Sequence, residues 1–158
     1  MYLALKMLHV FAVVAFLGNI SIGLYWKAMA DRSRSAAIME HTMKSIILAD
    51  RLFTIPSIVV LFLAGLAAAL IAHLPLLHTG WILWSLVLFT ISGIAFAPLT
   101  RVQVQLASTA AEIPSDDTAR ERYERLSRSW NVYGLIALGA PLVILVLMVV
   151  KLSLPTIP

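Results

Sequence analysis

Apolar residues fill four long stretches of the chain, and charged residues are confined to the segments between and beside them. Residues 52–100 contain no Asp, Glu, Lys or Arg, whereas about 20 apolar residues suffice to cross a hydrocarbon core of about 30 Å. This stretch predicts two spans joined by a tight hairpin at Pro75 and Gly80. We therefore expect an all-α polytopic membrane protein. It would be an antiparallel bundle of four transmembrane helices in one domain (residues 1–158), with spans of about 3–26, 51–72, 81–100 and 130–151.

The segment before the second span has a helical pattern of its own. Apolar residues recur at helical spacing between Ile38 and Ile47, while Glu40 and Lys44 form an i,i+4 pair on the other side. This pattern predicts an amphipathic helix that lies on the inner leaflet and leads into the second span. Pro56, near the start of that span, predicts a kink.

Basic residues predict the orientation of the bundle. Ten of the twelve Lys and Arg residues fall between Lys27 and Arg51 or between Arg101 and Arg128. By the positive-inside rule both of these connections face the cytoplasm. Both termini are then outside, with Lys6 and Lys151 at the outer ends of the first and last helices.

Composition narrows the class of protein and the chemistry open to it. The chain is 61% hydrophobic and 13% charged, with a mean hydropathy of +0.93, which excludes an ordinary soluble domain. Because it has no Cys, disulfides, thiolate metal sites, iron–sulfur clusters and covalently attached haem are excluded. The net charge of +4 comes from basic residues that lie beside the apolar spans and orient them in the membrane. We therefore expect lipid and no nucleic acid as a partner.

Histidines near the outer face suggest a cofactor site. His9 lies inside the first span on the same helix face as Lys6, and His73 and His78 flank the outer hairpin. Because His9 and His73 lie at similar depth in the predicted bundle, we expect them to be the axial ligands of a b-type haem, with His78 as the substitute for His73. Lys6 and Lys151 would pair with the propionates. The alternatives are a packing role for His9 and a headgroup-level position for the other two.

A second group of polar residues lies at the inner boundary. An antiparallel bundle brings to one level Asn19, Trp26, Lys27, Asp50, Arg51, Arg101, Gln103 and Asn131. We expect Asp50 to contact Lys27 or Arg101, since each charge otherwise stands alone at the hydrocarbon edge. The group is either an aromatic belt with an ion pair or a pocket for a proton or a lipid headgroup.

Several of these blocks carry a family resemblance. Residues 16–19 (FLGN), 26–27 (WK) and 49–56 (ADRLFTIP) resemble a bacterial family of predicted integral membrane proteins catalogued as domain of unknown function 2269. That family is distantly similar to the four-helix group of copper-resistance D-type proteins and membrane protoporphyrinogen oxidase, in which a His early in helix one is linked to haem. Only His9 matches that group here, and the oxidase's third-helix Lys is absent from residues 81–99. The resemblance implies a multi-pass protein of the bacterial cytoplasmic (inner) membrane.

Three classes of function fit these observations. The leading hypothesis is b-type haem binding near the outer face, with a redox or haem-handling role. The first alternative is a non-enzymatic small subunit or assembly factor of a membrane complex, working with other membrane subunits or a second copy of the chain. The second is a proton or small-molecule pathway from Asp50 toward His9. Paired-carboxylate and Ser-His-Asp enzymes are disfavoured because every carboxylate lies at or beyond the inner boundary.

Overall fold

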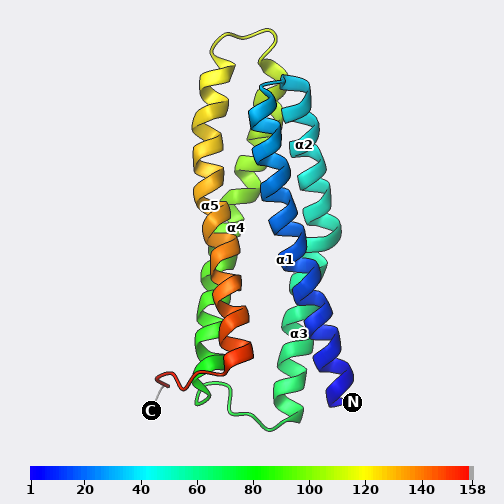
Figure 1. The fold of residues 1–158 in the computed structure, drawn as a ribbon, viewed down its shortest axis with the longest axis vertical. Helices are drawn as coiled ribbons and strands as arrows, with labels where there is room; N and C mark the ends of the chain where they lie inside the picture. Colours follow the sequence, from blue (N-terminus) through cyan, green and yellow to red (C-terminus); the bar gives the residue numbers. More distant parts are fainter. Residues whose placement is uncertain (157–158) are drawn as a thin grey trace.

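The chain folds into long, nearly parallel helical rods (Figure 1). The computed structural model describes residues 1–156. Helix α1 (Tyr2–Ser33) is followed by α2 (Ala36–Ala49), a π-helical turn η1 (Asp50–Thr54) and α3 (Ile55–Ile71), which continue one another without a break. Helices α4 (Gly80–Glu112) and α5 (Ala119–Val150) complete the bundle. Four helices are long and apolar enough to cross a membrane, and residues 1–156 contain no strand, so the predicted fold class is confirmed.

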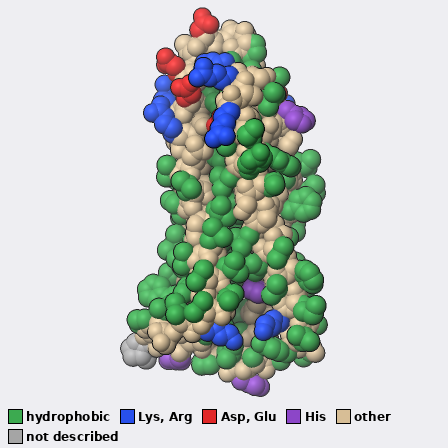
Figure 2. Space-filling view, viewed as in Figure 1, with side chains coloured by type: hydrophobic (Ala, Val, Ile, Leu, Met, Phe, Trp, Pro, Cys, Tyr) green, Lys and Arg blue, Asp and Glu red, His purple; other side chains and the backbone are tan. Residues whose placement is uncertain are grey.

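The rods are longer than a bilayer is thick. Helix α1 has 32 residues and is about 48 Å long, against a hydrocarbon core of about 30 Å. The excess falls at the end that holds the α1–α2 and α4–α5 turns, where acidic and basic side chains gather (Figure 2). We call this the charged end, comprising residues 27–49 and 101–130. The opposite end, with residue 1, the hairpin 72–79 and residues 151–156, is the terminal end.

The prediction of a helix lying on the inner leaflet is wrong. Helix α2 forms where expected, and Lys44 Nζ pairs with Glu40 Oε1 at 2.5 Å, but the helix runs straight on into η1 and α3. Its buried stripe, Met39, Met43 and Ile46, belongs to the same apolar core as Leu106 and Ala110 of α4. A neighbouring helix therefore covers the apolar face that lipid was expected to cover.

The distortion expected at Pro56 takes the form of the π-helical turn η1. Proline has no N–H group, and its ring clashes with the carbonyl four residues earlier, which here belongs to Leu52. One extra residue in the turn before Pro56 relieves this clash, and the backbone N–H of Ile55 bonds to the carbonyl of Asp50. Such single π turns are frequent at functional sites. Here the turn carries Asp50 and Thr54, both of which are buried.

Packing differs between the two ends. The apolar core lies toward the charged end and includes Leu106, Tyr123 and Trp130. Toward the terminal end the helices pack as two pairs, α1 with α3 and α4 with α5 (Figure 1). The rings of Phe62 and Phe89 bridge these pairs, with centroids 6.2 Å apart. The outer faces of the pairs are apolar and exposed, as expected for surfaces in contact with lipid.

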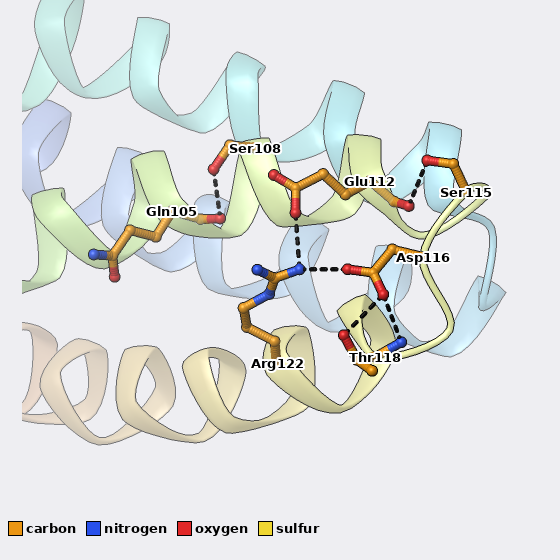
Figure 3. A network of polar contacts seen from close by, with 7 residues as sticks. All are labelled: Gln105, Ser108, Glu112, Ser115, Asp116, Thr118 and Arg122. Carbon is orange, nitrogen blue, oxygen red and sulfur yellow. Dashed lines mark hydrogen bonds and ion pairs between the residues drawn. The ribbon is translucent and has the colours of Figure 1, made fainter.

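A polar network closes the α4–α5 turn (Figure 3). Arg122 Nη2 donates hydrogen bonds to Glu112 Oε2 at 2.8 Å and to Asp116 Oδ2 at 2.9 Å. The hydroxyl and backbone N–H of Thr118 donate to Asp116 Oδ1. These hydrogen bonds from Thr118, with a smaller contribution from Arg122, hold the pKa of the Asp116 carboxyl below its usual value. The network thus joins α4 to α5 through side chains of the exposed turn.

Candidate functional site

Asp50 lies at the centre of a buried polar site built from three rods. Asp50 is 7% exposed, and Thr54 and Gln103 are 0% and 2% exposed. Asp50 Oδ1 accepts hydrogen bonds from Thr54 Oγ1 at 2.7 Å and from Asn19 Nδ2 at 3.2 Å. Asp50 Oδ2 accepts one from Gln103 Nε2 at 2.9 Å, and Asn19 Nδ2 also donates to Thr54 Oγ1 at 2.8 Å. We call these four residues the Asp50 site.

The expected ion pair at Asp50 is wrong. None of the ion pairs found in residues 1–156 includes Asp50. Lys27 lies eight residues beyond Asn19, about 12 Å along α1, and its ammonium pairs with Asp31 instead. Arg101 is exposed. The donors that surround the Asp50 carboxyl are therefore two amides and one hydroxyl, all of them neutral.

Local structure explains how the Asp50 site assembles. Asp50 and Thr54 stand one turn apart in η1, so their side chains lie on the same face. Asn19 reaches them from α1 and Gln103 from α4. A buried carboxyl that lacks a cation is held either ionised, by donors such as these, or as the neutral acid. The exchange between these two states binds or releases one proton.

Lys27 belongs to a separate buried network. Its side chain is 1% exposed, and its ammonium bonds to Asp31 and Ser127. Tyr123 OH donates to Asp31 Oδ1 at 2.8 Å and Ser127 Oγ donates to Asp31 Oδ2 at 3.1 Å. The ammonium also lies 5.4 Å from the ring centroid of Trp130 and 5.9 Å from that of Tyr123. We call the set Lys27, Asp31, Tyr123 and Ser127 the Lys27 network.

Sequence reasoning missed most of this network. A signal was present, because Lys27 and Asp31 are spaced i,i+4, as are Tyr123 and Ser127. Of the polar residues expected at one level, the structure joins Asn19, Asp50 and Gln103 in one site. Lys27 lies in the separate Lys27 network. The remaining four residues have exposed side chains: Trp26, Arg51, Arg101 and Asn131.

His9 packs closely against α3. Its Nδ1 lies 2.8 Å from the carbonyl oxygen of Leu61, and a Cβ atom at Gly65 would come within 2.7 Å of that nitrogen. Because the carbonyl can only accept, Nδ1 carries the proton in this contact. Nε2 is then the nitrogen with a free lone pair.

The remaining candidate ligands lie closer to the terminal end. His73 is exposed and has a left-handed backbone, with φ 52°, eight residues beyond Gly65 or about 12 Å along the helix. His78 and Lys6 are also exposed, and Lys151 Nζ lies 5.8 Å from the ring centroid of Trp81. The described residues contain no group of three or more His, Cys, Asp or Glu side chains placed to hold a metal.

Comparison with known proteins agrees with the helical architecture. No curated protein and no solved structure matches the chain. One family model, described as a predicted integral membrane protein (DUF2269), matches residues 3–152. This match covers nearly all of the 158 residues, including the Asp50 site, the Lys27 network and every helix apart from Tyr2 of α1. The chain therefore belongs to this family of predicted integral membrane proteins.

Proposed function

We propose that this membrane protein binds and releases a proton at Asp50, as part of a proton pathway through the bundle. The observation that carries the proposal is a carboxyl group buried between helices whose hydrogen-bond partners, Asn19, Thr54 and Gln103, are all neutral. Ionisable residues within membrane-spanning helices are costly and usually mark ion or proton routes. The π-helical turn that presents Asp50 is a second feature typical of functional sites.

The route beyond Asp50 is closed in this conformation. His9 lies ten residues from Asn19, about 15 Å along α1, and a small apolar crevice of about 60 Å³ lies at intermediate depth. Phe16, Ile58 and Phe89 are among its lining residues. Protons do not cross such a surface without water. Passage from Asp50 toward His9 therefore requires the α1–α3 pair and the α4–α5 pair to separate and admit water.

The test is proton flux into liposomes that contain the purified protein and a pH-sensitive dye, driven by an imposed membrane potential. We expect the wild-type protein to raise the flux above that of empty liposomes and Asp50→Asn to abolish the increase. Asp116→Asn, in the exposed α4–α5 turn, is the matched control and should conduct as the wild type does. Equal flux in the wild type and Asp50→Asn, or none above empty liposomes in the wild type, would refute the proposal.

A b-type haem bound through His9 is the second candidate function. It is supported by the contact between Nδ1 and the Leu61 carbonyl, because a hydrogen bond at one ring nitrogen fixes the tautomer and leaves the other nitrogen as a ligand. His73, with His78 as its substitute, would supply the second axial ligand, and Lys6 and Lys151 the contacts to the propionates. Bound haem would supply one-electron redox chemistry. His73 lies beyond the end of α3 and is exposed, so the fit rests on His9 alone.

Visible absorption of the purified protein tests the haem proposal. We expect a Soret band that shifts on reduction with dithionite, loss of that band in His9→Ala, and an unchanged spectrum in His41→Ala, whose histidine lies at the charged end. An unaltered spectrum in His9→Ala would exclude His9 as the ligand. If the protein shows neither haem nor proton flux, a structural subunit or assembly factor of a membrane complex becomes the favoured role.

We also propose an orientation and a location. Nine of the twelve Lys and Arg residues lie at the charged end and a tenth, Arg51, lies just beside it, and basic loops remain on the cytoplasmic side. The charged end would then face the cytoplasm, and both termini would lie on the outer side of the bacterial inner membrane. Under this orientation Asp50 is reached from the cytoplasm.

A further inference from the structure

A cleft lies at the charged end, away from the Asp50 site. It has a volume of about 590 Å³ and is bounded by α1, α2, α5 and the end of α4. Asp31, Tyr123 and Ser127 of the Lys27 network line it, together with Met39 and Ile113. Small-molecule sites are typically clefts of about 300–1,000 Å³ with mostly apolar walls and a few placed polar groups. This cleft has the size of such a site, but six of its eight lining residues are polar or charged, so its lining suits a charged ligand.

Two arginines at the cleft have no acidic partner. Arg34 and Arg120 both line it, and neither takes part in an ion pair within residues 1–156. Arg34 ends α1 in a left-handed conformation, with φ 53°, and Arg120 lies in the first turn of α5. The cleft thus joins guanidinium groups from two elements far apart in the sequence. Guanidinium groups bind carboxylate and phosphate oxygens in a bidentate manner.

The groups of the Lys27 network that line the cleft already have partners, so they do not occupy the Arg34 and Arg120 guanidinium groups. The charge of Asp31 is balanced by the buried Lys27 ammonium, and Tyr123 and Ser127 donate their hydroxyl protons to Asp31. Glu124, also at the cleft, is the remaining acidic side chain there. Two free guanidinium groups against one such carboxylate leave the cleft with an excess of positive charge.

The two arginines of the cleft lie beyond the level of the lipid headgroups, whereas Asp31 and Ser127 lie closer to the apolar spans. Arg34 lies seven residues past Lys27, about 10 Å along α1, and Arg120 lies ten residues before Trp130, about 15 Å along α5. Lys27 and Trp130 stand at the level where the apolar span of α5 begins. Headgroups add only about 5–8 Å on each side of the hydrocarbon core. A ligand between Arg34 and Arg120 therefore comes from the water phase.

We propose that this cleft binds a small water-soluble organic anion, a carboxylate or phosphate monoester. Its charged group is held by Arg34 and Arg120, and its apolar part lies against Met39 and Ile113. The proposal does not depend on proton transfer at Asp50, since the two sites share no residue. It adds a ligand site to a protein whose family description names none.

Calorimetric titration of the protein in nanodiscs of neutral lipid tests the proposal, with phenyl phosphate and benzoate as probes. We expect saturable binding of at least one probe and a loss of affinity of about tenfold or more in Arg34→Gln and in Arg120→Gln. Glu124→Gln should bind more tightly because a repulsive charge is removed. Arg125→Gln is the matched control, because Arg125 is exposed on the same helix but does not line the cleft.

Three outcomes would overturn the proposal. One is the absence of saturable binding by both probes. Another is unchanged affinity in the double variant Arg34→Gln/Arg120→Gln, which remains folded because both side chains are exposed. The third is competition by anionic phospholipid: if nanodiscs containing phosphatidic acid abolish probe binding, the arginines serve a lipid headgroup instead of a soluble ligand.

Discussion

Replacing Asp31 with Ala should lower the free energy of unfolding by about 3 kcal/mol or more, because the Lys27 ammonium is left buried without its counterion. The Lys27 side chain is 1% exposed and that of Asp31 is 29% exposed. Water that enters beside Asp31 can replace part of the lost contact, which favours the lower end of the range measured for buried pairs. The measurement is unfolding in mixed micelles by a denaturing detergent, followed by far-ultraviolet circular dichroism.

A second Lys–acid pair provides the control for Asp31→Ala. Lys44 and Glu40 have the same i,i+4 spacing, but the Lys44 side chain is 65% exposed. Glu40→Ala should therefore cost only about 0.3–0.5 kcal/mol. The double variant Lys27→Met/Asp31→Ala should regain much of the stability lost in Asp31→Ala, since it also removes the buried charge. Equal losses of unfolding free energy in Asp31→Ala and Glu40→Ala would show that burial of Lys27 does not strengthen the contribution of its ion pair to stability.

Replacing Gly65 with Ala should separate α1 from α3 and destabilise the protein by about 1–3 kcal/mol. The new methyl group would come within 2.7 Å of His9 Nδ1, so the imidazole must move and its contact with the Leu61 carbonyl is lost. Thermal unfolding in lipid nanodiscs measures the effect.

Two further variants isolate the contact at Gly65. Gly18→Ala should be neutral or slightly stabilising, because no atom lies within 4 Å of the added Cβ and Ala has the higher helix propensity. His9→Ala/Gly65→Ala should be more stable than Gly65→Ala, since the clashing ring is removed. If Gly65→Ala proved as stable as the wild type, close approach of α1 and α3 at His9 would be wrong.

Three of the four residues of the Asp50 site, Asn19, Asp50 and Gln103, could be predicted to face the bundle interior because polar side chains turn inward in hydrocarbon. Their positions along the spans differ, since Asn19 lies seven residues inside its expected span, whereas Asp50 and Gln103 lie one and three residues outside theirs. The partners of Asp50 could not be predicted. Several donors stand near the inner boundary, and a sequence does not tell which of them faces the carboxyl.

The charged end was harder to predict because its helix boundaries leave little trace in the sequence. The α1–α2 turn consists of Arg34 and Ser35 and contains neither Gly nor Pro, the usual turn residues. The apolar stripe of α2 suits a lipid surface and a neighbouring helix equally well. The sequence pattern therefore predicts Asp50 as a partner of Lys27, whereas Lys27 bonds to Asp31 and Ser127 inside a helical core that continues past the apolar spans.

Because the helices pack as two pairs toward the terminal end, the surrounding bilayer influences how far the α1–α3 pair stands from the α4–α5 pair. There the backbones of α3 and α4 are not in contact within the described residues, and the Phe62–Phe89 ring pair bridges them. An aromatic pair contributes about 0.5–1.5 kcal/mol, and lipid chains replace its apolar contacts without a hydrophobic penalty. The apolar core at the charged end joins α1, α2, α4 and α5, whereas separation of the spans beyond it would cost little free energy in lipid. In water the same separation would expose apolar side chains and be strongly opposed, so the surrounding solvent sets how far this bundle opens.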